Sequence, residues 1–197
     1  MLISQVISQD HRYLDECYDK LKAASTLEDK IKWRNILVWN LARHAISEEL
    51  TVYPAMEEHL GEKGKELARI DFQHHQAIKD GLSQLHFLSP SDPQFPSLLE
   101  QLMDNLHRHI EHEKETDMPL LESAISKVES ERIALGFMRT KKLVPTKSQP
   151  GAPSRSSLTE GLAGLLVAPI GKLRDLVEGF PEKEATGSKV VDWSGMV

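Results

Sequence analysis

The sequence has little that would mark a secreted or membrane-spanning protein. It contains a single cysteine, Cys17, so no disulfide bond can form within the chain. Its uncharged stretches are too short and too polar to cross a bilayer. The N-terminal segment MLISQVISQDHRYLDE has no basic start and no apolar centre, so we see no secretory signal in it. We therefore expect a cytoplasmic protein without a membrane span.

The sequence also lacks the patterns of a β-sheet protein. No segment alternates apolar and polar residues with a period of two, and the turn signals of β-hairpins are missing. Strongly basic composition is missing as well, because the net charge is −6. This balance argues against nucleic acid as a partner.

What the sequence does contain is helical periodicity. Apolar residues recur at helical spacing over 2–24, 29–56 and 63–88, and again after a proline-rich loop, with Ser97 as the expected N-cap. Four long amphipathic helices with short connections favour an all-α, up-down-up-down four-helix bundle. We place this bundle at residues 1–140.

The C-terminal part of the chain differs from the bundle in composition. Residues 141–157 are rich in Pro, Ser and Gly and predict a flexible linker. Residues 158–180 carry apolar side chains on one helical face and predict a short amphipathic tail segment, which we expect to dock on the outside of the bundle. A separate protein partner for this tail is the open alternative. Residues 181–197 are expected to be disordered.

Nine histidines are the unusual feature, and their spacing is informative. Counted from His44, leucines stand at −7 and −3, a glutamate at +4 and a proline at +10, and the same residue types stand at the same offsets from His109. His11 and His75 share apolar residues at +3 and +10. His11 precedes His44 by 33 residues, and His75 precedes His109 by 34. The chain is therefore an approximate tandem of two helical hairpins.

This repeat predicts a dinuclear metal site. A residue and its fourth successor lie on the same helix face, so each of two helices presents one histidine and one glutamate to a common point. The other two helices add one imidazole each, and a carboxylate with two oxygens can bridge two cations. Imidazole with carboxylate suits iron rather than calcium or magnesium. The predicted metal ligands are His11, His44, Glu48, His75, His109 and Glu113.

The competing interpretation is an ordinary core. A single histidine on an apolar face, such as His11 alone, is more often a core residue than a metal ligand. Buried glutamates are rare unless they are paired, because unpaired burial costs several kcal/mol. Two glutamates in register across the repeat, each four residues after a histidine, are better explained by metal binding.

Several neighbouring residues fit the pattern less well. His74 is an alternative to His75, although the register favours His75. His107 and Glu111 have the same spacing as the predicted ligands but lie off the leucine stripe. Glu49 is expected to point about 100° away from the metal face.

Three further residues are candidates for supporting roles. His112 also lies off the leucine stripe, and an outer role beside the metal ligands is open to it. Asp10 and Asp71 could each orient a ligand imidazole by accepting its other N–H. We expect these two aspartates to be surface charges instead.

At these residues the sequence resembles the hemerythrin and HHE cation-binding family, over about residues 1–135. The matching pieces are Asp10-His11 with Leu14, the segment HAISE from His44 with Pro54, the segment HQAI from His75, and the segment HIEHE from His109 with Pro119. The resemblance implies a four-helix bundle with two iron ions joined by an oxo or hydroxo bridge. It also implies that both glutamates bridge the irons and that the four histidines are terminal ligands.

One departure from the family bears on function. The oxygen-carrying members have a fifth histidine one turn after the third-helix ligand, where this chain has Lys79. We expect a protein that binds or senses dioxygen or a related small oxidant, or handles iron. The alternatives are a di-iron oxidoreductase acting on peroxide or nitric oxide, and an interaction module with a purely structural metal. Whether it is an enzyme is open, and we favour a binding or sensing protein. No Ser/His/Asp or Cys/His pattern appears that would indicate a nucleophilic enzyme.

Overall fold

The structure of the protein is a computed structural model that describes residues 1–143. It is all-α, as the sequence predicts, and the described residues contain no strand. The elements in chain order are α1 (Ile3–Ala23), α2 (Leu27–Leu60), α3 (Glu62–Phe87), α4 (Phe95–His112), the π-helical turn η1 (Glu113–Asp117), α5 (Met118–Ala124) and α6 (Lys127–Leu143). The tail segments predicted at 158–180 and 181–197 lie outside the described residues, as does the predicted linker beyond Leu143.

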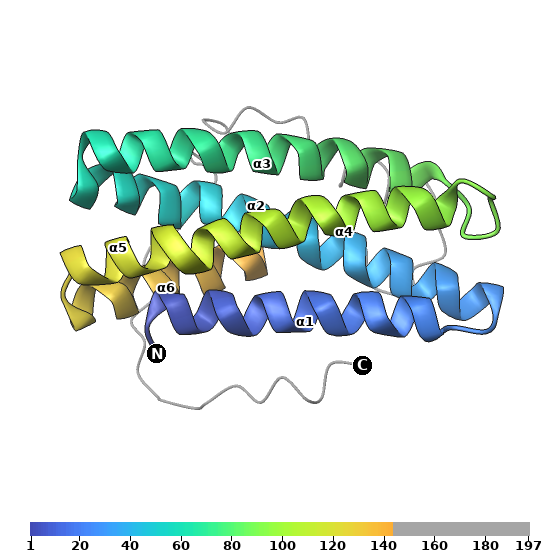
Figure 1. The fold of residues 1–197 in the computed structure, drawn as a ribbon. Coiled ribbons are helices and arrows are strands. Elements are labelled where there is room, and N and C mark those ends of the chain that lie inside the picture. The colour runs from blue at the N-terminus through green and yellow to red at the C-terminus, as the bar shows by residue number, and fades with distance from the viewer. Residues whose placement is uncertain (144–197) are drawn as a thin grey trace, which may run out of the picture.

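Four rods run side by side along a common axis (Figure 1). The fourth rod consists of α4, η1 and α5, which follow one another without a break. Short connections join α1 to α2 and α2 to α3, where Gly61 turns the chain at a φ of 58°. The up-down-up-down bundle predicted from the periodicity is therefore the observed architecture.

The structure adds a helix that the sequence prediction does not contain. Helix α6 packs against α1 and α2 and extends to Leu143, three residues into the predicted linker. It buries Ile133, Ala134 and Phe137 against the bundle. These few apolar positions among charged residues give too weak a period to predict the helix.

The fourth rod also begins earlier than predicted. Its first residue is Phe95, with Pro96 in the first turn, rather than the residue after Ser97. Asp92 organises this start, because its carboxylate accepts the N–H of Gln94 at 2.8 Å and its carbonyl accepts the N–H of Phe95 at 3.0 Å. A proline in the first turn costs no helical hydrogen bond, which permits the early start.

Two apolar clusters fill the two ends of the bundle. One contains Leu14, Leu41, Ile78 and Leu106, and the other contains Ile7, Val52, Leu67 and Met118. In each of the four rods, the predicted metal ligands lie in the sequence between residues of the first cluster and residues of the second. The polar groups between the clusters are therefore held in the middle of the bundle, away from water.

Candidate metal centre

The four predicted ligand histidines meet as two facing pairs in the middle of the bundle. The Nε2 atoms of His11 and His44 are 3.0 Å apart, which joins α1 to α2. The Nε2 atoms of His75 and His109 are 3.1 Å apart, which joins α3 to α4. All four side chains are buried. Each helical hairpin of the tandem repeat therefore supplies one imidazole pair.

Glu48 lies between the two pairs and offers one oxygen to each. Its Oε1 is 3.0 Å from Nε2 of His44 and 4.0 Å from Nε2 of His11. Its Oε2 is 3.2 Å from Nε2 of His75 and 3.6 Å from Nε2 of His109. This is the arrangement of a carboxylate that bridges two cations.

Glu113 reaches the same space from the π-helical turn. Its Oε2 is 3.4 Å from Nε2 of His11, and its side chain is fully enclosed. The turn closes through a hydrogen bond from the N–H of Met118 to the carbonyl of Glu113, five residues apart. Such wide turns are frequent at functional sites. Burial and the nearby Glu48 carboxylate raise the pKa of Glu113 well above its usual value.

The oxygens of the two glutamates fit a bound metal better than a hydrogen-bond network. None of the four oxygens of Glu48 and Glu113 has a hydrogen-bond partner in the described part of the chain, although ring nitrogens lie close by. A separation of about 3 Å is expected between ligand atoms whose bonds to one first-row metal ion are about 2.1 Å long. A pair of dications would compensate both carboxylates. The residues present therefore fit a dinuclear metal site.

The pKa values of the side chains in the centre indicate that a bound cation would replace protons. Burial opposes protonation of His44, but the Glu48 and Asp10 carboxylates outweigh it and raise the pKa of His44 to about 9. Burial and the positive His44 lower the pKa of His11 to about 3. The protein groups alone therefore balance the carboxylates with protons, which metal ions would displace.

Carboxylates accept hydrogen bonds from the outer nitrogens of two of the histidines. Nδ1 of His44 donates to Asp10 at 2.8 Å, and Lys141 of α6 makes an ion pair with the same aspartate. Nδ1 of His75 donates to Glu49 at 2.9 Å. Contacts of this kind fix the tautomer and the ring orientation of a metal ligand. Helix α6 thus takes part in orienting the candidate centre.

The two aspartates beside the centre correct a prediction. Asp10 and Asp71 were expected to be surface charges, and this is wrong for both. The Asp10 side chain is 15% exposed and accepts a hydrogen bond from His44, and the Asp71 side chain is fully buried between α3 and α4. Its Oδ1 is 3.7 Å from Nδ1 of His109. The sequence pattern of α3 alone cannot show this, since the burial comes from the neighbouring helix.

Sequence reasoning missed two further contributors to the site. Tyr53 is fully buried, and its hydroxyl lies 2.9 Å from Nε2 and 3.3 Å from Nδ1 of His75. Glu49 was expected to point away from the metal face, yet it contacts His75 and also pairs with Lys79, whose Nζ lies 2.6 Å from its Oε1. Both contacts cross between α2 and α3, so periodicity within one helix does not reveal them.

The remaining histidines lie outside the central group. Ring nitrogens of His75, not of His74, face Glu48 and His109, and the His74 side chain is 34% exposed. His107 is exposed and contacts Asp15 of α1 at 2.9 Å. The structure therefore places both residues as the repeat register predicts.

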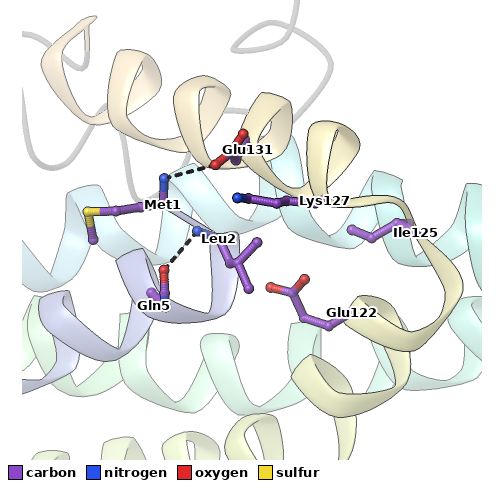
Figure 2. A pocket seen from close by; sticks show the side chains of 7 residues that line it. All are labelled: Met1, Leu2, Gln5, Glu122, Ile125, Lys127 and Glu131. Atoms are coloured by element: carbon purple, nitrogen blue, oxygen red, sulfur yellow. Dashed lines mark hydrogen bonds and ion pairs between the residues drawn. The ribbon is translucent and has the colours of Figure 1, made fainter.

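A shallow hollow on the surface is a poor alternative site (Figure 2). It lies beside the N-terminus of α1 and is lined by Met1, Leu2, Gln5, Glu122, Ile125, Lys127 and Glu131. The amino group of Met1 contacts Glu131 at 3.4 Å, and Leu2 donates its N–H to Gln5 at 3.0 Å. No histidine lines the hollow, so we place the chemistry in the buried centre.

Comparison with known proteins agrees with the fold and with metal binding. Residues 2–121 match the family described as the Hemerythrin HHE cation binding domain. An uncharacterized hemerythrin-like protein of Schizosaccharomyces pombe is 43% identical over 179 residues, which cover 91% of this chain and 88% of that protein. A DNA nickase of Nostoc sp. is 27% identical over 141 residues, and the match covers 72% of this chain but 39% of the nickase.

One solved structure shares the fold. A hemerythrin HHE cation-binding domain-containing protein from Mycobacterium kansasii superposes with a TM-score of 0.66 at 18% identity, covering 82% of this chain and 99% of the other. At this identity the likeness concerns the fold alone. In the part of the chain that the structure describes, no helix combines the length and apolar composition needed to cross a membrane.

Proposed function

The chain belongs to the hemerythrin HHE cation-binding domain family, and on that premise we propose that it holds a non-haem di-iron centre that binds or senses dioxygen or a related small oxidant. The observation that carries the proposal is the position of Glu48. Its two oxygens face two different histidine pairs, and neither oxygen has a hydrogen-bond partner among the described residues. Ligands of imidazole and carboxylate suit iron.

Each proposed ligand has a defined place. His11 and His44 would hold one iron, His75 and His109 would hold the other, and Glu48 would bridge them. Glu113 approaches from the fourth rod and would complete the bridge, with its Oε2 on the His11 side. Iron held in this way would supply a reversible one-electron couple and an open position for a small ligand.

The protein groups around the irons would tune that position. The apolar clusters exclude water at both ends of the bundle. Tyr53 places a hydroxyl 2.9 Å from Nε2 of His75, where it could donate a hydrogen bond to a small ligand. Lys79 stands where oxygen-carrying relatives have a fifth histidine, and it is engaged with Glu49 instead. The iron held by His75 and His109 would therefore have one protein ligand fewer than the corresponding iron in those carriers.

That missing ligand also favours a second candidate function. An open position on iron suits a di-iron oxidoreductase acting on peroxide or nitric oxide as well as a sensor. The two functions differ in turnover. A sensor consumes oxidant in proportion to the protein present, whereas an enzyme consumes many equivalents per centre.

The test is oxidant consumption by the reduced, iron-loaded full chain. We expect about one equivalent of dioxygen to be taken up per di-iron centre, with an optical change that reverses on reduction. Glu48→Ala should take up none, because the centre is lost. Consumption of many equivalents of peroxide or nitric oxide would replace the sensor proposal by the oxidoreductase one. No optical response to any of the three would contradict both.

A further inference from the structure

A second group of buried ionisable side chains lies beside the candidate di-iron centre. It is on the Nδ1 side of His109, whereas Nε2 of that ring faces His75. Asp71 of α3 and Asp117 of η1 are fully buried there. Nδ1 of His112 lies between them, 3.3 Å from Oδ1 of Asp71 and 3.2 Å from Oδ2 of Asp117.

The π-helical turn creates this group. His112 and Asp117 are five residues apart, a spacing that puts two side chains on different faces of an α-helix. A π turn closes between residues five apart, so that the two side chains stand nearly one above the other. The turn therefore aligns Asp117 with His112.

The carboxylates in this group lack the partners that buried charges need. All four oxygens of Asp71 and Asp117 are without a hydrogen-bond partner in the described residues, and so is Nδ1 of His112. His74 adds a second imidazole, with Nδ1 at 3.9 Å from Oδ1 of Asp71 and its ring 5.6 Å from the His112 ring. Unpaired buried carboxylates cost several kcal/mol unless a proton or a cation compensates them.

We propose that Asp71, His112 and Asp117 form a mononuclear site for a divalent transition-metal cation of the Zn²⁺ type, with His74 at its outer edge. Two carboxylates neutralise a dication, and one imidazole with two carboxylate oxygens supplies three ligands to a tetrahedral ion, with the fourth position left to water. The separations of 3.2 and 3.3 Å around Nδ1 of His112 are those expected of atoms that share one such ion.

The surroundings of the site agree with a cation that enters from solvent. The side chains of His74 and His112 are 34% and 26% exposed, so the two imidazoles form the outer wall while the two aspartates form the floor. The di-iron ligands, by contrast, are closed off from solvent. The two sites share Asp71 as a neighbour, but the proposed cation site uses none of the six proposed iron ligands.

The competing arrangement is a proton shared between the two aspartates. Burial and the Asp71 carboxylate raise the pKa of Asp117 to about 7, which is the behaviour of such a pair. A proton and a cation would satisfy the same oxygens. The two arrangements differ in whether the protein takes up a metal ion in addition to iron.

The experiment is equilibrium dialysis of the iron-loaded full chain against Zn²⁺, followed by analysis of both metals. We expect one zinc per chain in addition to an unchanged iron content. Asp117→Asn keeps the shape of the side chain but removes its charge, and zinc uptake should weaken at least tenfold while iron stays. His107→Ala on the same rod removes an exposed imidazole that faces Asp15 and should keep full zinc uptake.

His112→Ala provides a second variant, since a partly exposed ring is removed without adding a buried charge. It should lose zinc and retain iron as well. The proposal is overturned if the iron-loaded protein takes up no zinc, if zinc enters only as iron leaves, or if both variants bind zinc as tightly as the unmodified chain. Iron content before dialysis reports on the di-iron proposal separately.

Discussion

At the scale of single residues, we expect substitution of Glu48 to have the largest effect on iron binding. Glu48→Ala removes the carboxylate that faces both histidine pairs, so both irons lose a ligand at once. We expect iron affinity to fall by far more than the roughly 10–100-fold typical of outer-shell changes, with most of the dinuclear metal lost. Glu113→Ala should behave in the same way. Metal analysis after reconstitution measures both.

His107→Ala is the matched control for these variants. His107 also lies four residues before a glutamate on the same rod, but its ring is exposed and contacts Asp15. Iron content should be unchanged. If His107→Ala removed the metal and His109→Ala did not, the ligand register along α4 would be wrong.

Tyr53 is predicted to act on the bound ligand rather than on the metal content. Tyr53→Phe keeps the buried ring and removes the hydroxyl that lies near Nε2 of His75. Two irons should remain bound, whereas the small ligand should dissociate about tenfold faster, because a hydrogen bond of about 1.4 kcal/mol is lost. Stopped-flow spectroscopy on the reduced, iron-loaded chain measures this rate. An unchanged dissociation rate would remove Tyr53 from the ligand-binding role.

The residues that sequence reasoning found and those it missed differ in one physical respect. His44 with Glu48, and His109 with Glu113, lie one helical turn apart, so periodicity within a single helix reveals them. The contacts of Tyr53 and Glu49 with His75 cross between helices, and no spacing along one helix encodes them. The structure brings the six predicted ligands together, and their occupation by iron stays a prediction.

At the scale of elements, the packing of α3 on α2 depends on Gly64. A Cβ atom at this position would lie 1.9 Å from the backbone oxygen of Met56, and backbone cannot move aside as a side chain can. We expect Gly64→Ala to destabilise the protein by about 3 kcal/mol or more, measured by chemical denaturation.

Gly136→Ala is the control for this prediction. A Cβ at Gly136 of α6 would meet Cγ2 of Thr51 at 3.5 Å, which is ordinary van der Waals contact. Because alanine favours a helix over glycine by about 1 kcal/mol, this variant should be neutral or slightly stabilising. Equal destabilisation of both variants would contradict the close approach of α2 and α3 near Gly64.

Some helices could be predicted from the sequence and others could not. The four amphipathic rods follow from a clear apolar period. Helix α6 and the π turn do not, because α6 offers few apolar positions and the five residues of η1 carry no pattern that separates a π turn from an α-helix. Both matter for the site, since Lys141 of α6 contacts Asp10 and η1 carries Glu113.

At the scale of the whole molecule, the metal is predicted to be part of the stability of the fold. Removing it leaves Glu48 and Glu113 buried in the centre of the bundle, where only protons on the neighbouring groups compensate their charge. A ligand present at about 1,000 times its Kd stabilises the native state by about 4 kcal/mol. For a chain of this size that corresponds to about 10 °C in Tm.

Thermal unfolding with and without a strong iron chelator measures this effect. The unmodified protein should melt at a lower temperature after chelation, whereas the Tm of Glu48→Ala should not respond. A Tm of the unmodified chain that stays the same after complete iron removal would mean that the bundle does not depend on its centre.

The central claim is that two irons occupy the space around Glu48, and the most direct measurement is metal analysis of the iron-reconstituted chain together with its optical spectrum in the reduced and air-exposed states. We predict about two irons per chain and a spectrum that changes on exposure to air and returns on reduction. A protein that contains one zinc and no iron, with no optical response to air, would contradict the account.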